Sequence, residues 1–300
     1  MRCRHRGRLR TIATVLAISS QVVYGHVGNA AGVFALQRLG HEVWPVPTVL
    51  LAHHPGHGAP AGRRFSAEEL SALVDGLAAR GWLGRIDAVL SGYLGGGEQA
   101  EVVASTVARV KRVNPSALYL CDPVLGDAES GLYASPGVAE AMTRLVAKAD
   151  ITTPNLFELH HLAGPPDFSD PVAMARRLGV PCVVTTSAPA DPDQIGVLCL
   201  VDGAAWQMET PLFRVPEGRM APKGTGDLFA ALLLGTLLTG NGQAASWQAR
   251  TPRAAAWAAE ATSDIFARSV EGGHDELALE ALQDRLTVTS VLADPKPLSR

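Results

Sequence analysis

The sequence has few cysteines, little excess charge and no long apolar run, and each shortage narrows the classes of protein to consider. Its four cysteines, Cys3, Cys121, Cys182 and Cys199, occur in no CxxC or Cys-His spacing. Neither a zinc site nor a disulfide framework is therefore indicated, and we expect reduced, buried thiols in a cytoplasmic protein.

Two further absences concern binding partners. The net charge of -3 comes without a basic stripe, which argues against nucleic acid as a partner. No apolar run approaches the roughly 20 residues that a membrane helix requires. The sequence also lacks GxxxxGK[ST], and it lacks GxGxxG after the first predicted strand. A small molecule is the expected partner, and any phosphate site must lie outside these two familiar motifs.

The N-terminal residues, MRCRHRGRLR and then TIATVLAIS, imitate the basic and apolar parts of a secretory signal. Because the apolar run is short and contains two threonines, we instead expect residues 1–10 to form a basic, loose tail before a buried strand. The composition, 47% hydrophobic and 18% charged, allows one α/β domain or two small ones. No linker divides the chain, so residues 11–290 are expected to form a single domain and residues 291–300 a C-terminal tail.

Short apolar runs rich in β-branched residues alternate with amphipathic runs along most of the chain. This pattern is typical of an α/β fold with a mostly parallel sheet and helices on both faces. Later runs, PCVVTTSA, IGVLCLVDG and AAWQMETP, have no helix between them and predict an antiparallel edge. Three more helices are expected, from Gly226, from about Gln243 and from His274.

The longest segment rich in glycine, proline and histidine is AHHPGHGAPAGRR, residues 52–64. It is too irregular for the interior of a helix or strand, and it follows a predicted strand. Long loops of this kind often act as lids, so we interpret it as a mobile flap. A surface loop without function is the alternative.

The stretch APKGTGDLFAALLLG, residues 221–235, places a lone acid between a glycine turn and an apolar helix. Gly224 and Gly226 flank Thr225 and allow another molecule to approach the backbone, whose N–H groups point outward together. Such a turn is an anion site. Asp227 beside it would repel a resting phosphate, so it fits better as a base during phosphoryl transfer to a hydroxyl. Simple helix capping by Asp227 is the alternative.

Other loops that follow the predicted strands also carry acids, and ligands of open α/β sheets bind beyond the carboxyl ends of the strands. Asp122 follows one strand in CDPVLGD, where a carboxylate meets ligand phosphates or their metal. Asn155 and Glu158 share one face of a helix's first turn in TPNLFEL. Ordinary helix capping explains this last pair equally simply.

Several motifs together resemble the pyridoxal kinases of the ribokinase superfamily, from about Ile12 to at least Ala267. They are SSQVVYGHVGNAAGVFALQRLGHEVWPVPTV, DAVLSGYLG, CDPVLGD, TPNLFEL and GTGDLFAALLL, in the order of that family. The GTGD motif belongs to the whole superfamily, whereas VVYGHVGN and LSGYLG are specific to pyridoxal kinases. The resemblance implies a ribokinase-like fold and ATP-dependent phosphorylation of the 5'-hydroxymethyl group of pyridoxal, with pyridoxine and pyridoxamine as further substrates.

The resemblance also implies roles for individual residues. Asp227 would be the catalytic base, and the amides of Gly224, Thr225 and Gly226 would hold the transferring phosphoryl group. Ser20, Pro55 and Gly56 would contact the substrate, although the Ser20 hydroxyl has loop capping as its alternative role. Asp122 and Glu158 would act around Mg²⁺ through water, which fits the strong hydration of this ion. The implied ATP contacts are Asp122, Tyr133, Thr153, Glu158, Thr186, Thr210, Pro211, Leu212 and Phe213, of which Tyr133 and Thr186 are alternatively packing residues.

The same resemblance suggests a homodimer and activation by K⁺. Three departures from the family pattern leave the preferred vitamer open: Pro55 replaces a flap threonine, Gln21 replaces a histidine, and Lys223 precedes the glycine turn. The histidines His26, His53, His54 and His57 lack helical spacing and a carboxylate companion in the sequence, which disfavours a metal site there.

Two alternatives to a pyridoxal kinase remain at this point. A hydroxymethylpyrimidine or sugar kinase would share GTGD but not VVYGHVGN. A non-catalytic protein that binds vitamin B6 or a nucleotide would gain nothing from an unpaired base beside phosphate, so the presence of Asp227 disfavours it.

Overall fold

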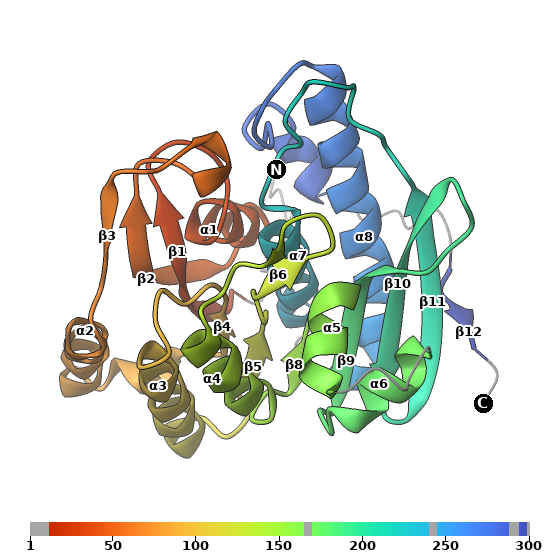
Figure 1. Cartoon of the computed structure of the whole chain (residues 1–300). Helices are drawn as coiled ribbons and strands as arrows, with labels where there is room; N and C mark the ends of the chain where they lie inside the picture. Colours follow the sequence, from red (N-terminus) through yellow and green to blue (C-terminus); the bar gives the residue numbers. More distant parts are fainter. Residues whose placement is uncertain (1–11, 165–169, 240–244, 288–293, 299–300) are drawn as a thin grey trace, which may run out of the picture.

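The fold is built on one twisted sheet of ten strands (Figure 1). The computed structural model describes residues 12–164, 170–239, 245–287 and 294–298. The expected tail at residues 1–10 lies outside the described residues, as does Cys3. The sheet has the order β12-β11-β10-β9-β8-β5-β4-β1-β2-β3. The strands are β1 (Thr14–Val22), β2 (Glu42–Leu51), β3 (Gly62–Arg64), β4 (Ala88–Ser91), β5 (Leu118–Cys121), β8 (Ile151–Thr152), β9 (Cys182–Ala188), β10 (Gln194–Val201), β11 (Ala204–Pro211) and β12 (Lys296–Pro297).

The sheet is parallel through its centre and antiparallel at both edges. Strands β2, β1, β4, β5, β8 and β9 pair in parallel, whereas β9, β10, β11 and β12 pair antiparallel. The predicted α/β class and its antiparallel edge are therefore confirmed. The second edge, where β3 pairs antiparallel with β2, was not expected.

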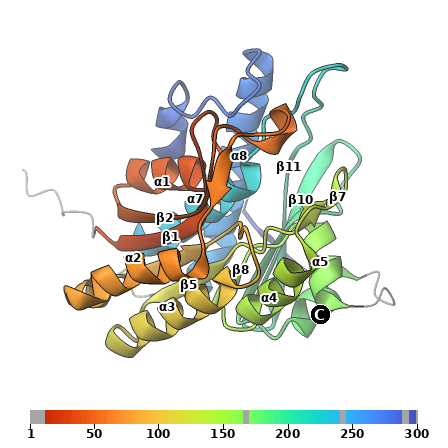
Figure 2. The same ribbon diagram turned by 60° about the vertical axis from the view of Figure 1, so that its left-hand side comes forward.

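Helices cover both faces of the sheet, as Figures 1 and 2 show from two directions. Alternate residues of β1 reach two separate cores: Val15 and Ala17 lie in one, Leu16 and Ile18 in the other. This alternation follows from the pleat of a strand that is buried on both faces. The first core includes α1 (Asn29–Arg38), α7 (Thr225–Thr239) and α8 (Trp247–Glu271), and the second includes α2 (Ala67–Ala79), α3 (Gln99–Val113), α4 (Pro136–Val146), α5 (Leu156–Ala163) and α6 (Pro171–Arg177).

Helix α7 explains why the run after Asp227 is almost wholly apolar. Every residue from Leu228 to Gly235 is buried, because α1 and α8 pack against it while it lies on the sheet. A helix that is enclosed on all sides carries no polar face. Burial of α7 therefore fixes the position of its N-terminus, and of Asp227, at the edge of the core.

The expected helix from His274 was wrong. Bends and turns follow α8, and only a short 3-10 helix forms later, at Gln283–Thr287. Gly272 and Gly273 end α8, and the fully buried Leu277 and Leu279 form a tight turn in which the Leu279 amide donates to the Leu277 carbonyl at 2.9 Å. Helix α8 itself begins at Trp247 with Ser246 as its cap, and Gln243 lies outside the described residues.

Two segments expected to be irregular contain regular structure. Residues 52–64 include a 3-10 helix, Pro55–His57, and strand β3. Residues 291–300 include β12, which pairs with β11. Cys121, Cys182 and Cys199 are buried free thiols, as expected. Among the helices that the structure describes, none combines the length and apolar character that crossing a bilayer demands.

Candidate functional site

The glycine turn before α7 is shaped by close contact with the loop after β1. Gly224 has a φ of 94°, a conformation that favours glycine, and a Cβ there would lie 1.9 Å from the carbonyl oxygen of His26. Gly226, by contrast, is exposed and a Cβ on it would meet nothing within 4 Å. Gly224 is thus needed for the fold, while Gly226 leaves the outer side of the helix N-terminus open to a ligand.

Asp227 lies in the first turn of α7, partly buried. Burial raises the pKa of its carboxyl from 3.8 to about 6, although a hydrogen bond from the Gly28 amide opposes this shift. Burial destabilises the charged form of a carboxylate, which makes the group a stronger proton acceptor once it is ionised. A base with a pKa just below neutral pH is well matched to general-base catalysis.

Asp227 and Asp122 line the same small cavity, of about 10 Å³, roughly the room for one water. Gly92, from the LSGYLG motif, leaves space there, because a Cβ on it would lie 2.5 Å from the Ser19 hydroxyl and 3.8 Å from Asp227 Oδ1. The other residues that line the cavity are Ser19, Gly28, Asn29, Gly32, Leu90 and Ala230. The structure thus brings together the acids of CDPVLGD and GTGD.

Asp122 directly follows β5 and is buried. Its Oδ1 accepts a hydrogen bond of 3.0 Å from the Thr153 hydroxyl. Burial, together with the negative charges of Glu158 and Asp227, raises the pKa of Asp122 well above its usual value. A cation or a proton near these carboxylates would relieve their repulsion.

Glu158 forms a capping box with Asn155 at the start of α5, so the capping alternative is realised. Its Oε2 accepts from the Asn155 amide at 2.9 Å, and its Oε1 accepts from the Leu125 amide at 2.9 Å. Burial raises the pKa of Glu158 to about 7, against the effect of these amides. Glu158 therefore fixes the loop that follows Asp122. Its role near a metal ion stays a prediction beside this capping role.

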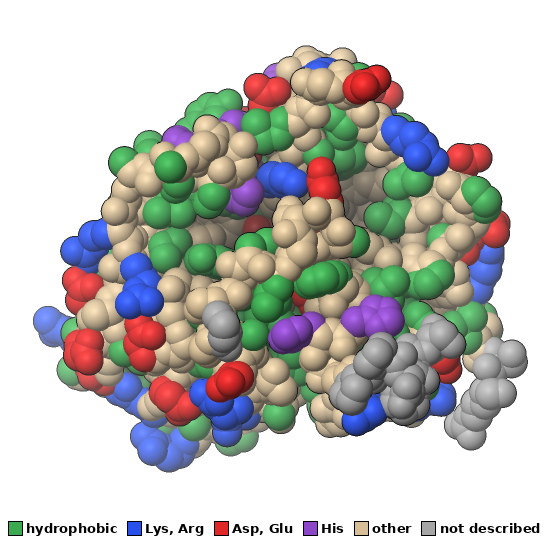
Figure 3. Space-filling model, in the orientation of Figure 1, with side chains coloured by type: hydrophobic (Ala, Val, Ile, Leu, Met, Phe, Trp, Pro, Cys, Tyr) green, Lys and Arg blue, Asp and Glu red, His purple; other side chains and the backbone are tan. Residues whose placement is uncertain are grey.

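The residues expected to contact nucleotide lie near Asp122, after the β6–β7 hairpin and at the end of β11. Thr153 is buried beside Asp122, and the Thr186 amide donates to the Pro154 carbonyl at 3.0 Å. Tyr133 follows the hairpin of β6 (Gly126–Asp127) and β7 (Gly131–Leu132) and is half exposed. At the end of β11, Thr210 is buried, Pro211 is exposed, and Leu212 and Phe213 are exposed to 38% and 39%. Figure 3 shows a hollow over the centre of this face, with charged and histidine side chains along it.

Ser20 is buried, and Gly28, with a φ of 57°, lies against it: a Cβ on Gly28 would be 2.2 Å from the Ser20 hydroxyl oxygen. Ser19 and Asn29 line the cavity, and sequence reasoning missed them. The Asn29 side chain donates to the Ser19 carbonyl at 3.1 Å, which joins α1 to β1. The only signal in the sequence was their place in the motif SSQVVYGHVGN.

The flap lies close to the glycine turn. The Pro55–His57 helix is capped by His54, whose Nδ1 accepts from the Gly56 amide at 2.9 Å. A Cβ on Gly56 would lie 3.5 Å from Met220 Sδ. Lys223 forms an ion pair of 3.8 Å with Glu129 of the β6–β7 hairpin. Burial and the positive charge of Lys223 lower the pKa of His54.

Two of the histidines, His57 in the flap and His26 in the loop after β1, do have carboxylate companions, which come from the segment after α8. His57 pairs with Glu276 at 2.6 Å and His26 with Glu280 at 3.0 Å. Over the described ranges, no group of three or more histidine, cysteine, aspartate or glutamate side chains is arranged to hold a metal ion.

The fold and this site define a ribokinase-like phosphotransferase. A family model described as phosphomethylpyrimidine kinase matches residues 78–275. A pyridoxal kinase of Corynebacterium diphtheriae is 42% identical over 230 residues, covering 74% of this chain and 80% of the relative. One from Pseudomonas entomophila is 39% identical over 281 residues, covering 91% and 93%. The chain belongs to the phosphomethylpyrimidine kinase family and, within it, to the pyridoxal kinases.

Solved structures agree with this placement. The pyridoxal kinase of Leishmania donovani in complex with ADP and pyridoxamine has a TM-score of 0.82 at 30% identity, covering 95% of this chain and 99% of that one. The same enzyme with ADP and pyridoxine superposes equally well, with a TM-score of 0.82. The expected family and the ribokinase-like fold are thus confirmed.

Proposed function

We propose that this protein transfers the γ-phosphoryl group of ATP to the 5'-hydroxymethyl group of pyridoxal, which yields pyridoxal 5'-phosphate and ADP and salvages vitamin B6. The observation that carries the proposal is the position of Asp227, a carboxylate with a pKa of about 6 on the first turn of α7, beside an open glycine turn. A base and an anion site are thereby adjacent, as transfer to a hydroxyl requires.

Asp227 accepts the proton of the substrate hydroxyl while the oxygen attacks the γ-phosphorus and ADP leaves. The amides of Gly224, Thr225 and Gly226 hold the transferring group, because the N-terminus of a 15-residue helix favours negative charge. These amides stabilise the developing charge without reorganising.

Asp122 and Glu158 are the residues proposed to act on Mg²⁺, through water. Asp122 Oδ1 is engaged by Thr153, and both oxygens of Glu158 accept amides, yet a carboxylate has further lone pairs that accept from hydrating water. The negative charge gathered at Asp122 suits a hydrated cation. When bound, Mg²⁺ neutralises phosphate charge. Activation by K⁺, a homodimer and a cytoplasmic location are proposed on the family resemblance.

ATP is the proposed phosphoryl donor, bound by the residues around Asp122. Thr153 follows β8, Glu158 lies in the first turn of α5, and Thr186 lies near the end of β9. Ligands of open α/β sheets bind at these carboxyl ends of the strands. Tyr133, Leu212 and Phe213 expose apolar surface that suits a base, with Thr210 and Pro211 at the end of β11. The complexes of the Leishmania donovani enzyme with ADP support this assignment.

Ser20, Pro55 and Gly56 are proposed to hold the pyridine ring. A hydroxymethylpyrimidine is the second candidate acceptor, because the matching family model is described as phosphomethylpyrimidine kinase. The test is ATP consumption with a panel of pyridoxal, pyridoxine, hydroxymethylpyrimidine and ribose. Consumption with pyridoxal above the others supports the proposal, whereas no consumption with any vitamer, in a protein that binds ATP, contradicts it.

A further inference from the structure

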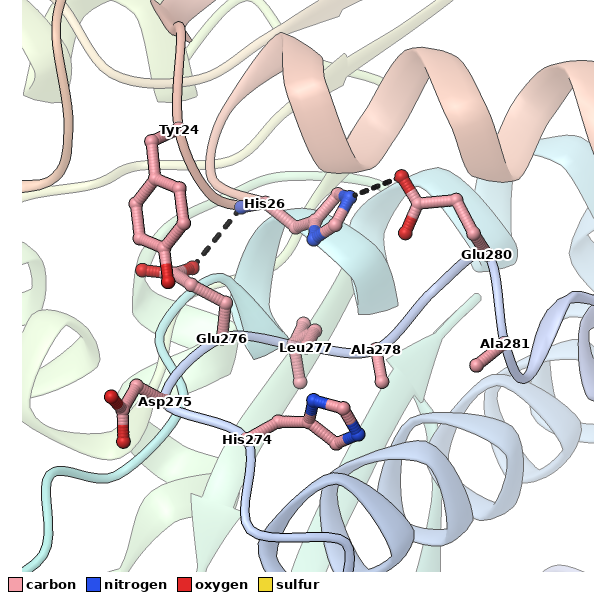
Figure 4. Close-up of a pocket in the computed structure, with 9 residues that line it drawn as sticks. All are labelled: Tyr24, His26, His274, Asp275, Glu276, Leu277, Ala278, Glu280 and Ala281. Atoms are coloured by element: carbon pink, nitrogen blue, oxygen red, sulfur yellow. Dashed lines mark hydrogen bonds and ion pairs between the residues drawn. The ribbon is translucent and has the colours of Figure 1, made fainter.

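Glu276 is a buried carboxylate for which the proposed phosphoryl transfer provides no role. It lies at a bend in the segment after α8 and is only 8% exposed. Its Oε1 accepts a hydrogen bond of 2.6 Å from His57 Nε2, and its Oε2 accepts one of 3.1 Å from the His26 amide. Figure 4 shows Glu276 directed toward the loop that carries His26. One carboxylate therefore joins the flap, the loop after β1 and the segment after α8.

The loop after β1 is shaped to receive this carboxylate. Gly25 has a φ of 95°, and a Cβ on it would lie 2.5 to 2.8 Å from the carboxylate atoms of Glu276. Only glycine allows so close an approach. The site for Glu276 is thus built into the backbone of the loop.

His57 is held on several sides at this contact. Its ring meets Tyr24 edge-on at 5.6 Å and His53 edge-on at 6.0 Å. The His53 Nδ1 lies 3.0 Å from the His54 carbonyl, which orders the start of the flap. The composition of the flap resembles that of a free loop. At this contact, the His57 side chain holds the flap against Glu276.

On the other side of Glu276, a cavity leaves the loop after β1 loosely packed. Tyr24, His26, Glu276 and Glu280 line a cavity of about 260 Å³ (Figure 4). His26 Nδ1, a buried atom, has no hydrogen-bond partner. Because a cavity provides no packing contacts, the hydrogen bonds of Glu276 add to those that the Val23 and Tyr24 amides donate to the Leu51 and Ala52 carbonyls at 2.9 Å in positioning the loop.

The same loop leads to the proposed catalytic residues. The His26 amide is bound by Glu276, while its carbonyl lies against Gly224, the first residue of the phosphate turn. Two residues further on, the Gly28 amide hydrogen-bonds Asp227. A shift of His26 would therefore move both the wall of the anion site and the donor to the base.

We propose that Glu276 is a positioning residue that holds the flap and the His26 loop together over the substrate site. The expected changes in KM rest on the proposed function. The contact that holds the flap does not depend on that function. Loss of the contact should free the flap in the unliganded protein and weaken binding of the acceptor, because Pro55 and Gly56 of the flap are proposed to contact the acceptor rather than ATP.

Glu280 supplies a matched control. It comes from the same segment and contacts the same residue, with Oε1 3.0 Å from His26 Nε2. Its side chain is 66% exposed, and it is not hydrogen-bonded to the flap. Glu280→Gln therefore removes a similar charge without touching His57.

The experiment compares Glu276→Gln, His57→Ala and Glu280→Gln. Hydrogen exchange of residues 52–64 is measured in each unliganded protein, followed by the Michaelis constants for pyridoxal and ATP. We expect faster exchange in the first two variants, and a pyridoxal KM that rises roughly 10-fold with the ATP KM changed less than about 2-fold. Glu280→Gln should match the parent protein in both measurements. His57→Ala keeps the test decisive if Glu276→Gln fails to fold, since His57 contacts Glu276 from an exposed flap.

A double-variant cycle gives the second arm. If the two residues act through one contact, Glu276→Gln combined with His57→Ala should be no worse than Glu276→Gln alone. Unchanged exchange of the flap in both single variants, or additive effects in the double variant, would overturn the proposal. The exchange arm needs no substrate, so failure of the proposed function, seen as an inactive parent protein, is distinguishable from failure of this inference.

Discussion

Asp122 and Asp227 line one small cavity, where burial, and then the negative charges of Glu158 and Asp227, raise the pKa of Asp122 well above its usual value. The two acids come from the ends of different segments, one after β5 and one at the start of α7. Two carboxylates placed together in a partly dry site repel each other, so the arrangement costs stability unless a cation or proton intervenes. Such a cost is typical of a functional site.

Asp227→Asn should abolish most turnover and leave nucleotide binding intact. Removal of a positioned base costs on the order of 10²-fold or more in kcat. The measurement is kcat together with ATP affinity, with Asp191→Asn as a control at an exposed acid. A folded Asp227→Asn protein with near-normal turnover would contradict the assignment of Asp227 as the catalytic base.

The same variant should be more stable than the parent at neutral pH. Because the pKa of Asp227 is raised from 3.8 to about 6 in the fold, its contribution to stability is complete below about pH 4 and is lost as pH rises through about 6. Asparagine removes this cost, which is on the order of 2 kcal/mol at neutral pH. Thermal unfolding at about pH 4 and pH 8 tests the sign: a gain at pH 8 that shrinks at pH 4 is expected, and a loss at pH 8 contradicts it.

The pH dependence of catalysis should report the same group. Asp227 accepts a proton only when ionised, so kcat/KM for pyridoxal should fall below about pH 6. Glu158, with a pKa of about 7, lies near Asp122 and makes the acid limb steeper if its ionised form is also required. A profile measured from about pH 5 to 9 that stays flat down to pH 5 would be incompatible with a base of raised pKa.

Two glycine substitutions should separate the phosphate role of the turn from its structural role. Gly226→Val should damage phosphoryl transfer more than folding, since its side chain would point into open space where a phosphate is expected to approach. Gly224→Ala should instead destabilise the protein, because its Cβ would collide with the His26 carbonyl. Unfolding midpoints and kcat of both variants provide the test. If Gly226→Val fails to fold, that glycine has only a structural role.

Pro55→Thr restores the residue typical of the family at the exposed start of the flap helix. It should change KM for pyridoxal and leave KM for ATP nearly unchanged, because the flap is proposed to lie over the pyridine ring. Pro60→Thr, later in the same flap, is the control. Protease cleavage of residues 52–64 should also slow when both substrates bind. Equal cleavage with and without ligands, with an unchanged pyridoxal KM, would leave the flap as an ordinary surface loop.

Much of the fold could be predicted because the strands are buried on both faces and their hydrophobic runs are continuous. The antiparallel run from β9 to β11 was readable for the same reason. The segment after α8 was not, because ELALE suits a helix, whereas the structure forms turns there that bury Leu277 and Leu279 in the core.

The site was predictable where a motif places its residues locally, as in the turn at Gly224 and the acid at Asp227. Ser19, Asn29 and Glu276 were not identified, because their contacts join residues distant in the sequence. Glu276 meets His57 and His26 only after the sheet has brought three chain segments together. No spacing in the sequence encodes that contact.

The identity of the accepted hydroxyl tests the central claim most directly. The measurement is kcat/KM with ATP for pyridoxal and for hydroxymethylpyrimidine, with the phosphorylated product of each identified by mass. We expect pyridoxal to be favoured by on the order of 10-fold or more, and pyridoxal 5'-phosphate as its product, since acceptor choice depends on contacts in the ring pocket. Equal or greater kcat/KM for hydroxymethylpyrimidine would contradict the account.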